Sequence, residues 1–262
     1  MHQSRWLITG AAGRIGVALR RHLADRGIAL RSVDLATPQA VSEDDEVMTV
    51  DLRDLDAMTR SAEGCDGIVH LGGLSDEADF HDLAEVNIVG SYHVLEAARR
   101  AGIRRVVFAS SNRVTGMYPA DTMVDPSMPV RPDGFYGVAK IAGEALCRLY
   151  ADKFQLLTVT VRIGSYEERP QTQRDLRTWL SPGDALRAFD AAMIADQPGA
   201  VFYAVSANTE RWWSLNAGKQ LGYHPEDDAQ DWASFPAESY PPAQPQAGPY
   251  AAADFSTTRM NR

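Results

Sequence analysis

The stretch over residues 6–16 (WLITGAAGRIG) constrains the fold of this chain more than any other. Its short apolar run predicts a strand that stops at Gly10, and a helical pattern begins around Gly13 and Gly16. A strand that turns through glycines into a helix directs backbone N–H groups and the positive end of the helix dipole at one point. Gly10 allows the tight turn, Gly13 lets the backbone approach a pyrophosphate, and Gly16 lets the helix pack closely on the strand. We therefore predict an anion site here, although the G-x-x-G-x-x-G spacing differs from the common G-x-G-x-x-G.

The element after this turn indicates which anion binds. A helix over residues 17–27 ends at Gly27, and a second strand follows and ends at Asp34. Asp34 lies 24 residues after Gly10, close to the spacing of about 20 expected for the acidic residue that binds the adenosine ribose hydroxyls. A carboxylate there would repel the 2′-phosphate of NADP, and no Arg or Lys directly follows to attract it. The sequence therefore predicts NAD as the cofactor.

Strands and helices alternate along the rest of the chain. Parallel strands joined by helical crossovers form a doubly wound sheet, so we predict an α/β fold of the Rossmann type with a small C-terminal substrate-binding portion. Ligands of such sheets bind at the carboxyl ends of the strands. Further strands are expected over residues 46–51, 67–73, 104–111, 156–165 and 200–207, and helices over 54–64, 83–101, 136–154, 184–196 and 214–222.

The length of 262 residues fits one domain, and no linker divides it into two cores. We expect residues 1–165 to bind mainly the dinucleotide and residues 166–262 to add segments of the substrate site. Residues 112–135 hold several prolines and no periodic pattern, which predicts a loop over the ligand edge. The tail over residues 236–249 is rich in Pro, Ala and Gln and is expected to wrap the surface or join a subunit contact.

Bulk charge and cysteine content exclude several classes of protein. A formal net charge of −9 argues against binding to nucleic acid or to an anionic membrane surface. Two cysteines form no disulfide framework, no metal-binding cluster is visible, and no apolar run has the length of a membrane span. The N-terminus does not resemble a signal peptide because the glycine turn begins at Gly10. We expect a soluble cytoplasmic protein.

Ser111, Tyr136 and Lys140 are the predicted catalytic residues. Tyr136 and Lys140 lie four residues apart near the start of a helix, so they project from one face. A free phenol has a pKa near 10 and needs a neighbouring positive charge to serve as a base. An ammonium about 4 Å away contributes on the order of 4 kcal/mol, although desolvation opposes the shift in pKa. Such a tyrosine could take a hydroxyl proton as hydride leaves the same carbon, with Ser111 at a strand end holding the reacting oxygen.

These residues carry a family resemblance. GAAGRIG, Asp34, HLGG, ASSNRVTG and YGVAK resemble the extended short-chain dehydrogenase/reductases, also called the NAD-dependent epimerase/dehydratase family, over about residues 5–165. CDGIVHLGG, RPDGFYGVAK, VRIGS, Arg174 with TWLS, and SANTERWW resemble the bacterial uronate dehydrogenases within it. The resemblance implies oxidation of the anomeric carbon of cyclic glucuronate or galacturonate by NAD, which gives an aldarolactone.

The resemblance also implies two sets of ligand-binding residues. The NAD set is Gly10, Gly13, Arg14, Ile15, Gly16, Asp34, Asp51, Leu52, Leu71, Gly72, Gly73, Asn87, Tyr136, Lys140 and Ile163. The substrate set is Ser75, Ser111, Asn112, Arg113, Tyr136, Ser165 and Arg174.

Two arginines of the substrate set raise separate questions. A guanidinium is a bidentate partner for a carboxylate, so Arg174 is the predicted clamp for the acid group of the sugar. Arg113 stands where the family pattern has histidine, and arginine is longer, always charged and unable to accept a hydrogen bond. If Arg113 points into the site, substrate preference differs from that of the uronate enzymes; if it points away, little changes.

Two other functions stay open at the level of sequence. An epimerase or dehydrogenase acting on a sugar nucleotide usually needs a larger C-terminal domain than the roughly fifty residues present after the last predicted strand. A non-catalytic NAD-binding regulator would have no need for Tyr136 and Lys140. The resemblance also implies an assembly of identical copies, frequently formed through the helices that follow the fourth and fifth strands.

Overall fold

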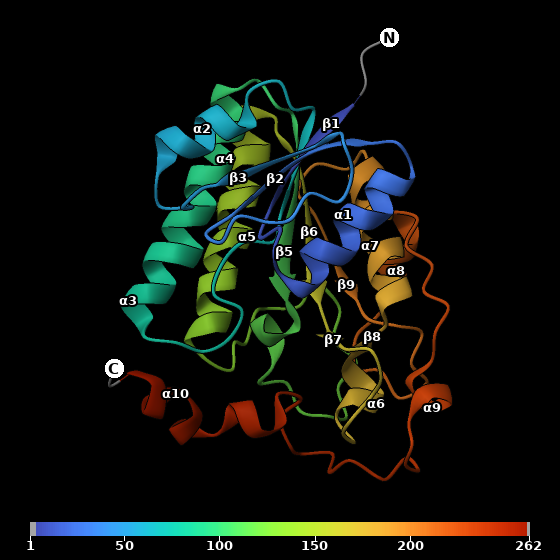
Figure 1. Cartoon of the computed structure of the whole chain (residues 1–262). Helices are drawn as coiled ribbons and strands as arrows, with labels where there is room; N and C mark the ends of the chain where they lie inside the picture. The colour runs from blue at the N-terminus through green and yellow to red at the C-terminus, as the bar shows by residue number, and fades with distance from the viewer. Residues whose placement is uncertain (1–3, 261–262) are drawn as a thin grey trace.

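A seven-stranded parallel sheet forms the centre of the molecule (Figure 1). The computed structural model describes residues 4–260. The strand order is β3-β2-β1-β4-β5-β6-β9, and each neighbouring pair is parallel. The predicted doubly wound α/β fold is therefore confirmed. The strands are β1 (Arg5–Thr9), β2 (Ala29–Asp34), β3 (Asp45–Thr49), β4 (Gly67–His70), β5 (Arg105–Ser111), β6 (Leu157–Ile163) and β9 (Ala200–Ala204).

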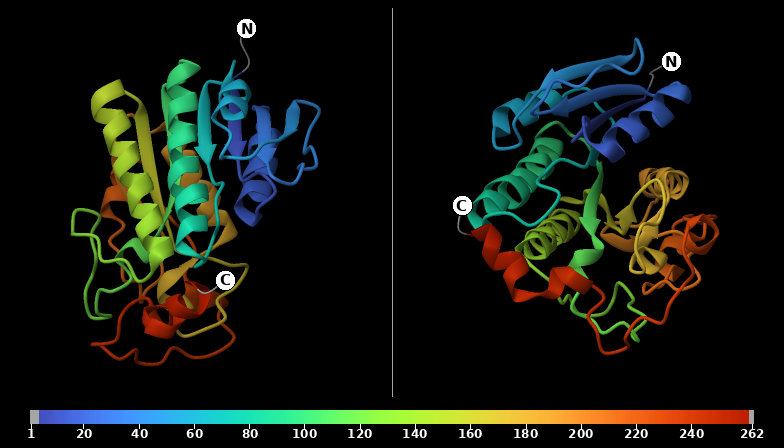
Figure 2. Two further views of the ribbon diagram at one scale, coloured as in Figure 1. Left: turned by 90° about the vertical axis from the view of Figure 1, so that its left-hand side faces the viewer. Right: turned by 60° about the horizontal axis from the view of Figure 1, so that its bottom comes forward.

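Helices cover both faces of this sheet (Figures 1 and 2). Consecutive strand residues point to opposite faces, so Leu7 and Ile8 of β1 are fully buried in two different apolar clusters. On one face lie α1 (Arg14–Asp25) and α7 (Pro182–Ile194), and on the other α2 (Leu55–Ala62), α4 (Gly90–Arg100) and α5 (Phe135–Phe154). The short helix α8 (Asn216–Gln220) packs against β9.

The helix predicted over residues 83–101 has three parts. These are α3 (Phe80–Leu83), a π-helical segment (Ala84–Val89) and α4. The hydroxyl of Ser91 donates to the carbonyl of Asn87 at 2.5 Å, and such a side-chain bond competes with the regular backbone pattern. Apolar periodicity continues through the segment, so the sequence did not reveal it.

Segments predicted to be irregular contain short elements. A 3₁₀ turn (Asn112–Thr115) opens the loop that follows β5. A two-stranded sheet pairs β7 (Ser165–Tyr166) with β8 (Trp179–Leu180), and α6 (Asp175–Thr178) lies between them. These elements hold the loop after β6 beside the carboxyl edge of the main sheet.

The C-terminal part crosses that same edge (Figures 1 and 2). After α9 (Ala229–Trp232), the tail binds the loop that follows β5, with Gln246 N donating to Tyr118 O and Ala247 N to Gly116 O. A 3₁₀ turn (Gly248–Ala251) and α10 (Ala253–Met260) end the described chain, and the sequence analysis did not predict either. Backbone hydrogen bonds hold this tail, which is why apolar periodicity gave no sign of it. Between residues 4 and 260 there is no helix with the length and apolar character needed to cross a membrane.

Candidate active site

A cavity of about 920 Å³ runs along the carboxyl ends of the strands. It extends from the glycine turn after β1 to the loops that follow β5 and β6, and Tyr250 of the C-terminal tail also lines it. This is the edge at which a doubly wound sheet binds its ligands.

Close backbone packing shapes the glycine turn. Gly10 has φ +68°, and a Cβ there would lie 2.6 Å from the backbone nitrogen of Gly72. A Cβ on Gly16 would overlap the carbonyl oxygen of Gly10. Helix α1 starts at Arg14 with no side-chain cap and no acidic residue in its first turn. Its first N–H groups and the dipole therefore face the cavity, an arrangement that suits a pyrophosphate.

Asp34 at the end of β2 fixes this turn and lines the cavity. One of its carboxylate oxygens accepts from Ala12 N at 3.0 Å and the other from Leu35 N at 2.7 Å. These two hydrogen bonds hold the Asp34 carboxylate in place at the cavity wall. All but one of the residues in the NAD set line the cavity, namely Gly10, Gly13, Arg14, Ile15, Gly16, Asp34, Asp51, Leu52, Leu71, Gly72, Gly73, Tyr136, Lys140 and Ile163.

Asn87 is the exception. Its amide oxygen accepts from Leu74 N at 2.7 Å, and its amide nitrogen donates to Leu74 O at 2.9 Å. Its side chain therefore holds the loop after β4 in place and does not border the cavity. The residue that borders the cavity in this part of the π-helical segment is Val86.

Ser111, Tyr136 and Lys140 meet at the middle of the cavity. Ser111 is the last residue of β5, Tyr136 is the second residue of α5, and Lys140 lies one turn further along that helix. Tyr136 and Ser111 share a hydrogen bond. The ammonium of Lys140 donates to Ala109 O at 2.9 Å and lies 5.7 Å from the centre of the Tyr136 ring.

Burial dominates the electrostatics of this group. Burial raises the pKa of Tyr136 to about 12, while the hydrogen bond from Ser111 and the charge of Arg113 act to lower it. Burial also lowers the pKa of Lys140 to about 8. Desolvation, which the sequence analysis expected to oppose the effect of Lys140, therefore outweighs the ammonium, which donates to a backbone carbonyl.

The predicted substrate set lines the part of the cavity formed by the start of α5 and the loops after β4, β5 and β6. Arg174 is half-buried there, with Nε donating to Gln246 O at 2.9 Å and Nη1 donating to Ser165 Oγ at 3.4 Å. Burial lowers the pKa of this guanidinium from its ordinary value. Within residues 4–260, no carboxylate lies at ion-pair distance from Arg174. All members of the set line the cavity, namely Ser75, Ser111, Asn112, Arg113, Tyr136, Ser165 and Arg174.

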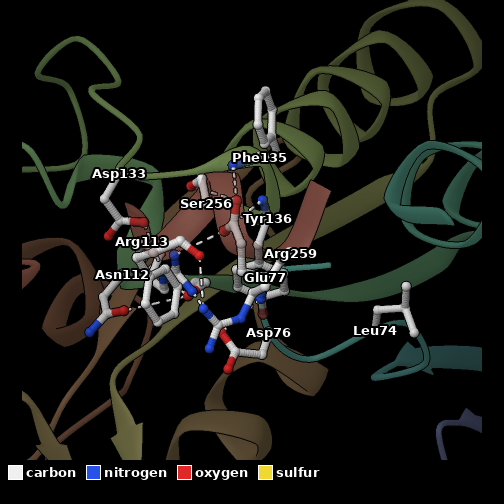
Figure 3. A network of polar contacts seen from close by, with 12 residues as sticks. Leu74, Asp76, Glu77, Asn112, Arg113, Asp133, Phe135, Tyr136, Ser256 and Arg259 are labelled. Atoms are coloured by element: carbon white, nitrogen blue, oxygen red, sulfur yellow. Dashed lines mark hydrogen bonds and ion pairs between the residues drawn. The ribbon is translucent and has the colours of Figure 1, made fainter. Parts of the chain in front are cut away.

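Arg113 has the opposite surroundings. Its Nε donates to Asp133 at 2.7 Å, its Nη1 to Asp76 at 2.9 Å and its Nη2 to Glu77 at 3.1 Å (Figure 3). The side chains of Glu77 and Asp133 are fully buried. Arg113 therefore borders the cavity with its charge already neutralised, whereas Arg174 has no carboxylate partner among the residues that the structure describes.

Comparison with known proteins agrees with this geometry. Residues 6–175 match the NAD dependent epimerase/dehydratase family. The chain belongs to this family. It is 40% identical over 257 residues to a uronate dehydrogenase of Pseudomonas syringae pv. tomato, covering 95% of this chain and 94% of the relative. A uronate dehydrogenase of Agrobacterium fabrum is 42% identical over 242 residues, covering 92% and 91%.

Solved structures show the same relationship. A uronate dehydrogenase variant from Agrobacterium tumefaciens, complexed with NAD, matches with a TM-score of 0.87 and 38% identity, covering 95% of this chain and 97% of that one. The family resemblance noted in the sequence is therefore confirmed. The likeness covers 95% of the chain and so extends beyond residues 5–165, over which the superfamily motifs lie.

Some cavity residues of this family member had no signal in the sequence. Asp76 follows Ser75 in the loop after β4, and Glu167 forms an ion pair with Arg14 across the cavity at 2.8 Å. Tyr250 lies in a tail without periodicity, so its place beside Arg113 and Arg174 could not be read from spacing. Tyr240 and Phe255 lie in the same Pro- and Ala-rich stretch, so aromatic character alone did not distinguish Tyr250.

Proposed function

We propose that this protein oxidises the anomeric carbon of a cyclic hexuronate, D-glucuronate or D-galacturonate, with NAD, and releases an aldarolactone. The observation that carries the proposal is Arg174, a half-buried guanidinium at the cavity wall with no carboxylate partner within the described residues. An unpaired cation in a partly desolvated position favours an anionic ligand, and the fork of a guanidinium matches a carboxylate. The relatives named uronate dehydrogenase support the same substrate class.

The residues present fit NAD. The glycine turn leaves no room for a Cβ at Gly10 or Gly16, so the backbone itself approaches the pyrophosphate, and Asp34 takes the ribose hydroxyls. When bound, NAD supplies the acceptor for the hydride of the sugar. In this proposal residues 1–165 hold mainly the dinucleotide, and residues 166–262 supply Arg174 and Tyr250 to the sugar end.

Tyr136 is the base in this account. The hydroxyl of Ser111 holds the anomeric oxygen, and Tyr136 takes its proton as the carbonyl of the lactone forms. Because burial raises the pKa of the phenol to about 12, Tyr136 works as a base only where nearby positive charge offsets that burial. Lys140, buried one helical turn away, is the fixed cation of the site.

The proposal is tested by absorbance of NADH with purified protein and four sugars. We expect D-glucuronate and D-galacturonate to react with a kcat/KM about a hundredfold or more above that of D-glucose and D-galactose, since the clamp acts only on the acids. Failure of all four sugars would support a non-catalytic NAD-binding protein. Equal rates on acids and neutral sugars would remove the role of Arg174.

The clamp itself is tested by Arg174→Met. Loss of a charge-assisted contact is expected to raise the KM for the hexuronate about tenfold to a hundredfold. The affinity for NAD should stay unchanged. Arg169→Met is the matched control, because Arg169 lies exposed in the same loop and outside the cavity, and it should leave both quantities unchanged.

We also propose that identical copies assemble through α4 and α5. Large apolar side chains are exposed on these helices, among them Tyr92, Val138, Leu149 and Phe154. We place the reaction in the cytoplasm, which agrees with the free thiols of Cys65 and Cys147. Sedimentation of the purified protein tests the assembly, with a dimer or larger species expected.

A further inference from the structure

The C-terminal segment over residues 248–260 crosses the sugar end of the cavity, and we call it the C-terminal cover. It contains the 3₁₀ turn Gly248–Ala251 and helix α10, and α10 has no fully buried residue. A helix with so little buried surface obtains little stability from packing. Specific contacts must therefore hold the C-terminal cover in place.

Arg113 supplies the main contacts. Its guanidinium carbon lies 4.7 Å from the centre of the Tyr250 ring and 5.3 Å from that of Phe255, and both rings belong to the C-terminal cover. A cation over an aromatic face is favourable, and more so where water is excluded. The same guanidinium binds Asp76, Glu77 and Asp133. Arg113 thereby ties the C-terminal cover to the loop after β4 and to the loop before α5.

Glu77 connects the C-terminal cover with the helix of the catalytic tyrosine. One of its oxygens accepts from Phe135 N at 2.7 Å and from Ser256 Oγ at 3.0 Å (Figure 3). The other accepts from Arg113 Nη2 at 3.1 Å and from Tyr136 N at 3.3 Å. Gly134, the N-cap of α5, has no side chain to cap this helix. Glu77 serves as that cap and is shared with α10.

Tyr250 is the part of the C-terminal cover that the substrate meets. Its ring centre lies 4.7 Å from the guanidinium carbon of Arg113 and 5.3 Å from that of Arg174, and Tyr250 lines the cavity. The residues just before it also contact the clamp, since Gln246 O accepts from Arg174 Nε. The ring of Tyr250 therefore forms part of the wall at the sugar end of the cavity.

We propose that residues 248–260 close the sugar pocket, that Arg113 is the positioning residue which anchors them, and that Tyr250 determines the size of the sugar accepted. The part concerning the sugar rests on the proposed function. Arg113 donates its N–H groups to three carboxylates, so Arg174 is the arginine that binds the acid group of the substrate. Tyr250, which lines the cavity beside Arg174, is then placed to limit how far a substrate extends past the clamp.

The anchor is tested by limited proteolysis of the full chain with saturating NAD. We expect Arg113→Met to speed chymotryptic cleavage after Tyr250 or Phe255 about tenfold or more, because the released C-terminal cover opens locally. Arg113→Lys, which keeps the charge, should restore part of the protection. Arg99→Met is the matched control, since Arg99 also pairs with a carboxylate, Glu96, and stacks on a ring, Phe154, outside the site.

Cleavage within residues 248–260 is compared with cleavage elsewhere in the chain. If Arg113→Met unfolds the protein, cuts appear throughout. Ser256→Ala and Phe255→Ala then test the same contacts from the half-exposed side of the C-terminal cover, and Phe255→Ala, which removes its own cleavage site, is scored at Tyr250 alone. Selective acceleration in these variants supports the proposal. Cleavage within about twofold of the wild-type rate in every folded variant would overturn it.

The role of Tyr250 is tested by the ratio of two kcat/KM values, for D-galacturonate and for 4-linked digalacturonate. We expect Tyr250→Ala to lower this preference for the monosaccharide about tenfold, with the Kd for NAD unchanged, and Tyr250→Phe to retain it. An unchanged ratio in Tyr250→Ala would overturn the size-determining role. Proteolysis needs no turnover, so a wild-type protein inactive on hexuronates would refute the proposed function while the anchor is still decided.

Discussion

At the scale of single residues, the two arginines of the site differ in whether a carboxylate of the protein already binds them. Arg113 and Arg174 flank the same ring of Tyr250, yet one is bound by three carboxylates and the other by none within residues 4–260. The sequence predicted both as substrate residues because composition does not reveal partners. Only the fold brings Asp76, Glu77 and Asp133 to one guanidinium.

Tyr136→Phe tests the base at this scale. Removing the hydroxyl leaves the ring and the packing but no group to take the proton, so we expect turnover to fall about a thousandfold. The Kd for NAD, measured by fluorescence titration, should change less than about twofold. Tyr92→Phe on the exposed face of α4 is the control and should keep full activity. Turnover within about tenfold of the wild type in Tyr136→Phe would rule out this base.

At the scale of elements, one histidine joins three of them beneath the cavity. His70 of β4 bonds Thr9 of β1 through Nδ1 at 2.7 Å and Ser91 of α4 through Nε2 at 3.1 Å. Thr9 Oγ1 also accepts from Gly72 N at 3.1 Å, so this chain of bonds supports the loop after β4. Burial, assisted by the charge of Lys140, lowers the pKa of His70 to about 3.

This burial predicts a loss of stability in acid. Between pH 6.5 and about 3 the unfolded chain binds a proton at His70 and the folded chain does not, so the free energy of unfolding falls as the pH falls. The loss attributable to His70 reaches about 3 kcal/mol by pH 4. Urea denaturation at pH 7.5, 5.5 and 4 measures it. His70→Gln should show a shallower fall, and equal slopes in the two proteins would contradict the assignment.

Some secondary-structure elements could be predicted from their local sequence and others could not. The glycine turn and the apolar strands were predictable because steric demands at Gly10 and Gly16 and the burial of both sheet faces act over a few neighbouring residues. The π-helical segment was not predictable, because the local feature associated with it is one hydrogen bond, from the Ser91 hydroxyl to the carbonyl of Asn87. Asn87 lies in that segment and consequently holds Leu74 and does not border the cavity.

At the scale of the whole molecule, the site is complete only when the two ends of the chain are considered together. The glycine turn lies near residue 10 and Tyr250 close to the C-terminus, yet both line one cavity. Contacts of this kind depend on backbone bonds, such as Ala247 N to Gly116 O, and on aromatic rings that meet distant arginines. No local pattern encodes them, so the glycine turn could be predicted from the sequence and the C-terminal cover could not.

In the proposed reaction, the hydrogen on the anomeric carbon of a hexuronate is transferred to NAD as hydride. Oxidation of D-galacturonate deuterated at that carbon, followed by NMR of both products, measures this transfer directly. We predict deuterium at C4 of the nicotinamide in NADH and a lactone without deuterium. Deuterium retained in the sugar, or no NADH formed from it, would contradict the account.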